Sequence, residues 1–349
     1  MLARKSVVPL PSGGSLETPL IVPSISSKGA GRSGPDARPG SFDQIDVFEA
    51  TLPALRRPVG LLVSSYDLHY GFIPRERFRD GARSLPVDLL LVDSGSYETL
   101  PFEGDPPYLQ DKRALPWDEW MFESTLESLR SPGDVALVSF DKHDTYELQI
   151  EAAQRFFGRR PGVLSDILLK PPPRIDPNDP TWRSPTFHDL EALAPCAAAL
   201  DAFGVIGVTE KELDPTPLGR LVILAQLREL LDDAGVKRPI HVFGGLDPLW
   251  TPLYVAAGAE IIDGLAWWRY AFDDGIASYQ DVAILRDAAL MEEPLGTGRA
   301  IVRQTNLEAL AQLTDDVNVY IEEGGEWAHF SRREILEQTY DAMIHVMRR

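Results

Sequence analysis

The chain has 349 residues, 44% of them hydrophobic, and a formal net charge of −19, so it is long enough for one large α/β barrel with an appendage or for two domains. The negative charge argues against a broadly basic nucleic-acid surface, because phosphate contacts by lysine and arginine supply most nonspecific affinity. The single cysteine, Cys196, excludes an internal disulfide and any zinc site with several cysteine ligands.

The predicted elements begin after residues 1–17, which are polar, contain glycine and serine, and are expected to form a flexible tail. Short apolar runs of strand length then alternate with helical segments. The runs that predict strands are residues 18–23, 58–65, 87–92, 134–140, 162–169, 203–208, 240–243 and 260–262. Eight strands alternating with helices is the count for a (β/α)8 TIM barrel, which we expect to span residues 18–291.

Helical patterns occupy the connections between these strands and dominate the end of the chain. Within the barrel they cover residues 42–55, 112–130, 146–157, 190–201, 218–234 and 251–258. Further helices are predicted at 283–291, 306–313 and 332–348, with a short strand at 317–321. Residues 292–349 are therefore expected to form a small helical C-terminal extension. The proline-rich loop at 171–179 has two equal interpretations, a cover over substrate or a rigid connector.

The sequence from 239 to 270 predicts a βαβ unit, with a buried strand, a glycine turn, a helix of small residues and a second buried strand. Asp263 stands where the second strand ends, and the carboxyl ends of parallel strands are where α/β folds place their chemistry. Residues 93–97, with the sequence DSGSY, follow another buried strand and so reach the same end of the barrel. Taken alone, Asp263 could equally be a helix cap, and a D-S-G tripeptide is commonly a turn.

Together these residues resemble the tRNA-guanine transglycosylases, TIM-barrel enzymes that exchange guanine in a nucleic acid for a 7-deazaguanine base. Asp263 and Arg269 keep the spacing between that family's nucleophilic aspartate and an arginine six positions on. Residues 93–97 resemble the family's D-S-G-G-[FY] motif, with Ser96 in place of the second glycine. One departure is that Trp267 and Trp268 replace the family's Pro-Thr before the arginine.

The resemblance implies that Asp263 attacks the nucleotide to give a covalent Asp–nucleotide intermediate, and that Asp93 is the general acid and base. Tyr97 and Phe243 would sandwich the base. Asp141 would read its edge, because an acceptor-only carboxylate can take the adjacent N1–H and N2–H donors of guanine. The other positions that match base-binding or phosphate-binding segments of the family are Ile206, Gly207, Glu210, Gly244 and Arg269.

The substrates implied are a nucleic acid and a free 7-deazaguanine base of the queuine or preQ type, with no cofactor. The family's C-x-C-x-x-C zinc site is missing. In this respect the chain resembles the related transglycosylase-like proteins that insert 7-deazaguanines into DNA. The resemblance thus leaves tRNA and DNA open, and a homodimer or companion modification proteins as partners are open too. A polyanion would have to meet a local patch, and the candidates are Arg155, Arg159, Arg160, Lys237, Arg238, Arg269, Arg348 and Arg349.

The sequence also leaves two other classes of function open. A barrel metal hydrolase would use Asp93, Asp141, His143, His241 and Asp263. A non-catalytic partner subunit is a further alternative, against which the presence of both Asp93 and Asp263 argues. The sequence contains no run of about 18 apolar residues and no secretory leader, so we expect a soluble cytoplasmic protein without membrane contact.

Overall fold

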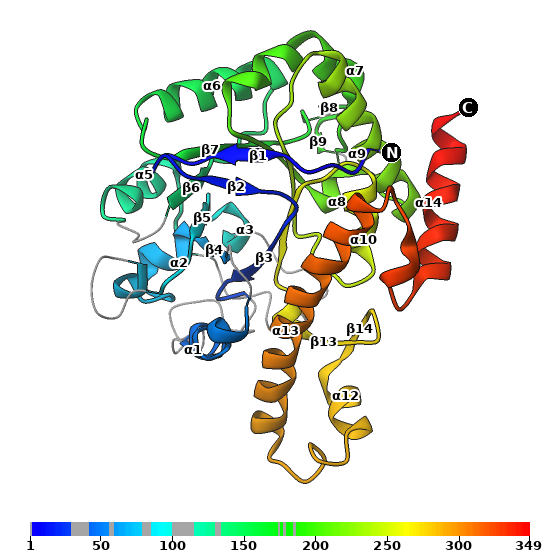
Figure 1. The fold of residues 1–349 in the computed structure, drawn as a ribbon. Helices are drawn as coiled ribbons and strands as arrows, with labels where there is room; N and C mark the ends of the chain where they lie inside the picture. The colour runs from blue at the N-terminus through cyan, green and yellow to red at the C-terminus, as the bar shows by residue number, and fades with distance from the viewer. Residues whose placement is uncertain are drawn as a thin grey trace.

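Eight parallel strands close into a barrel at the centre of the computed structural model (Figure 1). In order around the barrel, the strands are β3 (Leu20–Ile25), β4 (Gly60–Ser64), β5 (Leu89–Asp93), β6 (Asp134–Val138), β7 (Leu164–Leu169), β10 (Val205–Thr209), β11 (Ile240–Phe243) and β12 (Ile261–Gly264). The ring is completed where β12 pairs in parallel with β3. The predicted (β/α)8 TIM barrel is confirmed, and each barrel strand overlaps the apolar run that predicted it.

The structure describes residues 2–28, 42–55, 59–78, 85–99, 115–129, 134–173, 175–176, 179–183 and 186–349. The predicted proline-rich loop at 171–179 lies partly outside these ranges. Within its described part, β8 (Ile175–Asp176) pairs with β9 (Asp179–Arg183) as a short antiparallel hairpin. The two ends of the helix predicted at 112–130 also lie outside the described residues, and its middle contains α5 (Glu119–Glu127).

The barrel interior is filled by every second residue of the strands, because successive side chains of a strand point to opposite faces. On β3 these residues are Leu20 and Val22, and on β5 they are Leu89 and Leu91, all in one buried apolar cluster. Two positions further along the same face come Ser24 and Asp93. The apolar interior of the barrel therefore gives way to polar groups at the carboxyl ends of the strands.

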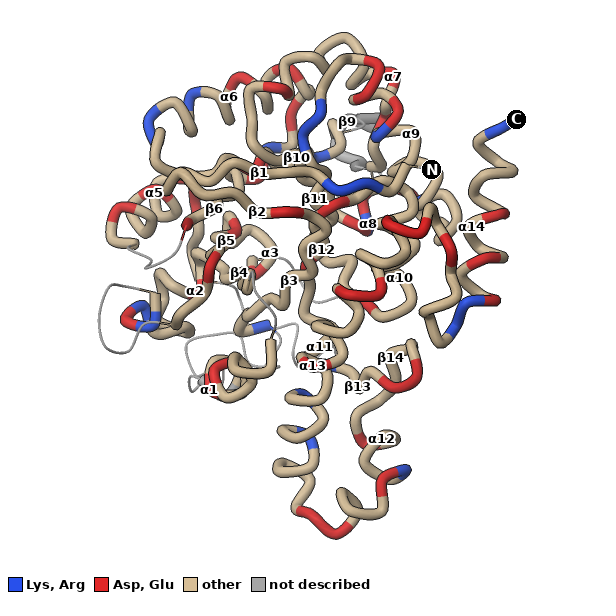
Figure 2. The backbone as a smooth tube through the Cα atoms, in the orientation of Figure 1, with Lys and Arg blue, Asp and Glu red and all other residues tan. Residues whose placement is uncertain are grey.

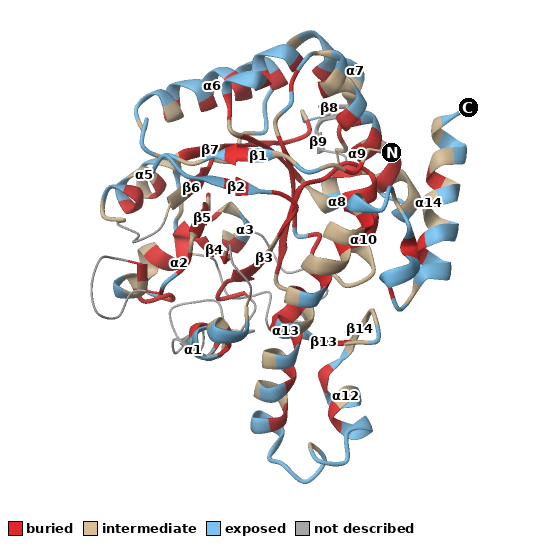
Figure 3. Cartoon of the chain, in the orientation of Figure 1, coloured by how far each residue is buried: buried red, intermediate tan, exposed pale blue. Residues whose placement is uncertain are grey.

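Helices cover the outside of the barrel, with their buried faces turned toward the strands (Figure 3). They are α1 (Phe42–Thr51), α2 (Ser65–Tyr70), α3 (Ser96–Thr99), α5, α6 (Tyr146–Gly158), α7 (Leu190–Leu193), α8 (Glu210–Leu213), α9 (Pro217–Asp233), α10 (Trp250–Ala256) and α11 (Ala266–Arg269), with 3-10 turns η1 (Leu52–Ala54), η2 (Arg75–Phe78) and η3 (Ala194–Ala202). Local sequence sets the start of the longest of these, because the Thr216 hydroxyl caps the Gly219 N–H at 3.0 Å and Pro217 begins α9.

The first residues of the chain form a β-hairpin where a flexible tail was expected for 1–17. Strand β1 (Val7–Pro9) pairs antiparallel with β2 (Ser15–Glu17). Gly13 takes a φ of +91° in the turn between them. The segment has no apolar run that would predict these strands, because only one residue of each strand is buried.

The hairpin lies across the amino-terminal end of the barrel (Figure 1). Val8 and Leu16 belong to the same apolar cluster as the inward residues of the barrel strands. The hydroxyl of Ser12 donates to Asp134, the first residue of β6, at 2.6 Å. These contacts place the hairpin at the opposite end of the barrel from Asp93 and Asp263.

After the barrel, the chain forms a hairpin and a set of helices. The elements are β13 (Tyr270–Asp273), β14 (Ile276–Tyr279), α12 (Gln280–Arg286), α13 (Leu295–Glu322), η4 (Trp327–His329) and α14 (Arg333–Met347). The predicted strand at 317–321 is wrong, because this segment continues α13, where Val317 and Tyr320 are buried at helical spacing beyond Leu313. In Figure 1, α12 and the first half of α13 project away from the barrel. Among the described helices none is long and apolar enough to cross a membrane.

Candidate active site

The two aspartates that the sequence predicts as catalytic lie at the same end of the barrel. Asp93 is the last residue of β5, and Asp263 lies in the second half of β12. Two more ionisable residues follow neighbouring strands, Asp141 after β6 and Lys170 after β7. The negative charge of Asp263 is among the causes that raise the pKa of Asp93, so the two carboxyl groups act on each other electrostatically.

Asp263 is only 5% exposed. Hydrogen-bond donors contact both of its carboxylate oxygens. The hydroxyl of Ser24 on β3 donates to Oδ2 at 2.6 Å. The backbone N–H of Gly244 donates to Oδ1 at 3.0 Å. Gly244 has a φ of +79°, a left-handed conformation that glycine adopts without strain and that turns the chain directly after β11. Hydrogen bonds from two different strand ends therefore fix the orientation of the Asp263 carboxylate.

Asp93 is surrounded by groups that oppose its ionisation. Burial raises its pKa well above the usual value, and the charges of Asp141, Glu98 and Asp263 raise it further. The backbone N–H of Gly95 opposes this only weakly, at 3.4 Å from Oδ2. A carboxyl group that keeps its proton to higher pH than usual is suited to give that proton to a leaving group.

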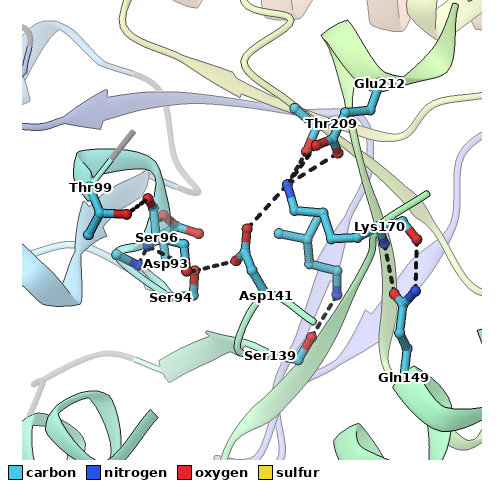
Figure 4. A network of polar contacts seen from close by, with 12 residues as sticks. Asp93, Ser94, Ser96, Thr99, Ser139, Asp141, Gln149, Lys170, Thr209 and Glu212 are labelled. Atoms are coloured by element: carbon cyan, nitrogen blue, oxygen red, sulfur yellow. Dashed lines mark hydrogen bonds and ion pairs between the residues drawn. The ribbon is translucent and has the colours of Figure 1, made fainter. Parts of the chain in front are cut away.

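Asp141 lies at the centre of a polar network that joins the ends of several barrel strands (Figure 4). The Ser94 hydroxyl donates to its Oδ1 at 2.5 Å, and Lys170 Nζ lies 3.2 Å from its Oδ2. Lys170 also lies 3.1 Å from Glu212 and donates to the Thr209 hydroxyl at 3.2 Å. Burial opposes the charged form of Lys170, but the two carboxylates outweigh it and raise its pKa.

The two predicted base-clamp residues lie in different environments. Phe243 is 8% exposed and belongs to the inner barrel cluster, with its ring centroid 3.8 Å from that of His241. Tyr97 on α3 is 41% exposed, and the Lys28 ammonium lies 4.1 Å from its ring centroid. Phe243 is therefore fixed by packing, whereas Tyr97 is open to solvent. The sandwich of a base between them stays a prediction.

Ile206 and Glu210 point away from the strand-end residues. Ile206 is fully buried in the apolar cluster between the barrel and its helices, so its side chain faces away from the barrel interior. The Glu210 carboxylate accepts hydrogen bonds from Arg220 and from the Tyr254 hydroxyl, both at 2.9 Å. The structure therefore does not bring either side chain into the cluster formed by Asp93, Asp141 and Asp263.

Gly207 lies in the middle of β10 and faces the barrel interior. A Cβ atom built on it would lie 2.5 Å from Phe243 Cε2 and 3.0 Å from Asp166 Oδ1. Both distances are shorter than ordinary van der Waals contact, so glycine leaves room here for a ring and a carboxylate. The residue matched the family's base-binding segment, and the structure gives it a packing role as well.

We expect Gly207→Ala to lower the free energy of unfolding by about 1–3 kcal/mol, the usual cost of overpacking a close-packed interior. Urea denaturation measures this change. The control is Gly296→Ala on α13, where an added Cβ meets nothing within 4 Å and alanine favours a helix, so no loss is expected. Equal stability of Gly207→Ala and the wild type would contradict the packing role.

Most of the basic residues proposed to meet a polyanion contact acidic neighbours instead. Arg269, on α11, is partly buried. Figure 2 shows acidic residues distributed over the helices around the barrel and in the C-terminal extension. The ion pairs are Arg155 with Glu151, Arg159 and Arg160 with Glu123, Lys237 with Asp232, and Arg238 with Asp201. These pairs reduce the positive potential that the residues would offer a phosphate backbone.

The side chains proposed for the metal-hydrolase alternative do not form a metal-ligand arrangement in the described part of the chain. Within the described ranges, no group of three or more His, Cys, Asp and Glu side chains has an arrangement that could hold a metal ion. His143 is exposed, whereas His241 is fully buried. That alternative therefore lacks a ligand cluster in this part of the chain.

Comparison with known proteins adds no further assignment. No protein-family model matches the chain, and no curated protein is similar enough to it to count as a relative.

The structure also reveals residues that the sequence analysis did not single out for the site. Ser24 holds the Asp263 carboxylate, Lys170 contacts both Asp141 and Glu212, and Asp166 contacts His241. For Asp166 a signal exists in the sequence, because it is a carboxylate inside a mostly apolar strand. Ser24 carries no such signal, since a serine before a loop is common.

Proposed function

We propose that the protein exchanges guanine in a nucleic acid for a 7-deazaguanine base through a covalent intermediate on Asp263. The observation that carries the proposal is the contrast between two neighbouring carboxyl groups. Asp263 accepts hydrogen bonds on both carboxylate oxygens, from Ser24 and Gly244, whereas burial and nearby charges raise the pKa of Asp93. A carboxylate held in place by donors suits a nucleophile, and a carboxyl group with a raised pKa suits a general acid.

In the first half of the reaction, a carboxylate oxygen of Asp263 attacks C1′ of the nucleotide. The C1′–N9 bond breaks, its electron pair goes to the base, and Asp93 supplies the proton that the leaving guanine takes up. In the second half, the incoming base gives a proton to Asp93 and attacks C1′. The bond from C1′ to Asp263 then breaks, and its electron pair returns to the carboxylate.

Recognition of the base is assigned to the network around Asp141. Each of its oxygens accepts one contact, from Ser94 or Lys170, and a carboxylate oxygen has a second lone pair for a base N–H. A base inside a stacked helix cannot reach such a site, so the nucleotide must be extruded. Phe243 and Tyr97 are proposed to contact its faces, and Arg269 the adjacent phosphate.

The test is incubation of the purified protein with a radiolabelled 7-deazaguanine base and either tRNA or duplex DNA. Incorporation of the label into one polymer supports the proposal and identifies the substrate. If a local cationic contact guides the polymer, incorporation should fall as salt rises, because salt cations compete for the phosphates. No incorporation into either polymer, with the family's known substrate bases all supplied, would contradict the proposal.

A further inference from the structure

A row of three buried ionisable side chains crosses the barrel interior and ends at Asp263. Asp166 on β7 is 1% exposed, and His241 on β11 is fully buried. His241 Nδ1 lies 2.7 Å from Asp166 Oδ2, and His241 Nε2 lies 3.4 Å from Asp263 Oδ1. Strand β10 separates β7 from β11, and Gly207 on that strand leaves space for the Asp166 carboxylate and for the Phe243 ring, which stacks on His241.

The carboxylates on either side of His241 favour its cationic form. Burial alone lowers the pKa of an imidazole, but Asp166 and Asp263 outweigh burial and raise the pKa of His241 to about 9. Among the described residues, the charged groups that face the His241 ring are Asp166 from β7 and Asp263 from β12. The Phe243 ring stacks on it. An imidazolium has an N–H donor on each nitrogen, so it can serve both carboxylates at once.

We propose that Asp166 and His241 are positioning residues, which orient the Asp263 carboxylate for attack and stabilise its negative charge as it leaves C1′. This inference rests on the proposed function. The group that bonds to the nucleotide is Asp263, and neither Asp166 nor His241 touches substrate.

The effect should be largest in the second half of the exchange. When the bond between C1′ and Asp263 breaks, the electron pair returns to the carboxylate, whose Oδ1 already faces the Gly244 N–H and His241 Nε2. The His241–Asp263 distance of 3.4 Å exceeds a normal hydrogen bond, as is frequent for catalytic contacts before substrate binds. Asp166 holds the His241 ring from the other side, because Asp166 contacts Nδ1 whereas Asp263 faces Nε2.

The experiment compares His241→Gln, Asp166→Asn and the double variant with the wild type. For each single change we expect kcat for base exchange to fall by about 10–100-fold, as when an outer partner of a reacting group is removed. The KM for the free base should change little. The double variant should lose no more activity than the worse single one, because the two residues act as a unit.

The fraction of enzyme trapped as nucleotide adduct separates positioning from a structural role. It should rise in His241→Gln, because departure of Asp263 slows, whereas simple misfolding would lower it. Melting curves record how much of each variant is folded. A kcat equal to that of the wild type, or a loss explained by the unfolded fraction, would overturn the inference.

A second measurement keeps the inference separate from the proposed function. In 15N NMR of the wild type at pH 7.5, both ring nitrogens of His241 should carry a proton, and Asp166→Asn should remove one. A neutral His241 in the wild type overturns the inference whatever the activity. If the wild type exchanges no base while His241 is cationic, it is the proposed function that fails.

Discussion

Asp263→Asn should abolish both base exchange and the covalent adduct with nucleic acid. The substitution keeps the shape of the side chain and one oxygen for the donors that hold it, but an amide lacks the anionic oxygen that attacks C1′. Denaturing gels of enzyme mixed with labelled nucleic acid show the adduct directly, and a base-incorporation assay shows the exchange.

The matched control for this change is Asp247→Asn. Asp247 lies in the turn between β11 and α10, and its Oδ1 accepts from the Leu249 N–H at 2.8 Å and from the Trp250 N–H at 3.2 Å. It has a structural role and no place in the proposed chemistry, so this variant should still form the adduct. Full activity of Asp263→Asn would end the proposed mechanism.

Asp93→Asn should reduce exchange by about 10²–10⁴-fold, the range usual for lost general acid and base catalysis. The nucleophile is retained, so a slowly formed adduct should still appear on denaturing gels. The variant thus differs from Asp263→Asn in the product that accumulates as well as in rate. An equal loss of adduct in both variants would contradict the separate roles.

The pH profile gives a second test of Asp93. A general acid works while it holds its proton, and the pKa of Asp93 is raised by burial and by Asp141, Glu98 and Asp263. Wild-type activity limited by departure of guanine should therefore persist as pH rises above the usual range of a carboxyl group and fall as pH passes the raised pKa. That decline should be missing in Asp93→Asn, because an amide does not titrate.

The barrel could be predicted from the sequence because its signals are local and repeated. Each strand is a short apolar run, and most are followed by a helix with one apolar face. The N-terminal hairpin has no such signal, since each of its strands buries a single residue, Val8 or Leu16. The strand wrongly predicted at 317–321 is a β-branched and aromatic run, whose helical state depends on packing within α13.

The candidate site was predictable where a residue ends a strand and not where it acts through another residue. Asp93 and Asp263 follow apolar runs, so the fold alone places them at one end of the barrel. The contact between Asp166 and His241 joins strands separated by β10, and a sequence does not reveal which side chains meet across an intervening strand. Glu210 matched by residue type, yet its neighbour Glu212 is the one that joins Lys170.

In the proposed mechanism, Asp263 becomes covalently bound to the nucleotide. Peptide mass spectrometry of the trapped adduct tests this most directly, after the nucleic acid is digested to a single nucleotide. The proposed mechanism predicts a sugar-phosphate mass, without the base, on Asp263 in the wild type and in Asp93→Asn, and on no residue in Asp263→Asn. A modification on any other residue, or exchange by the wild type through no trappable adduct, would contradict it.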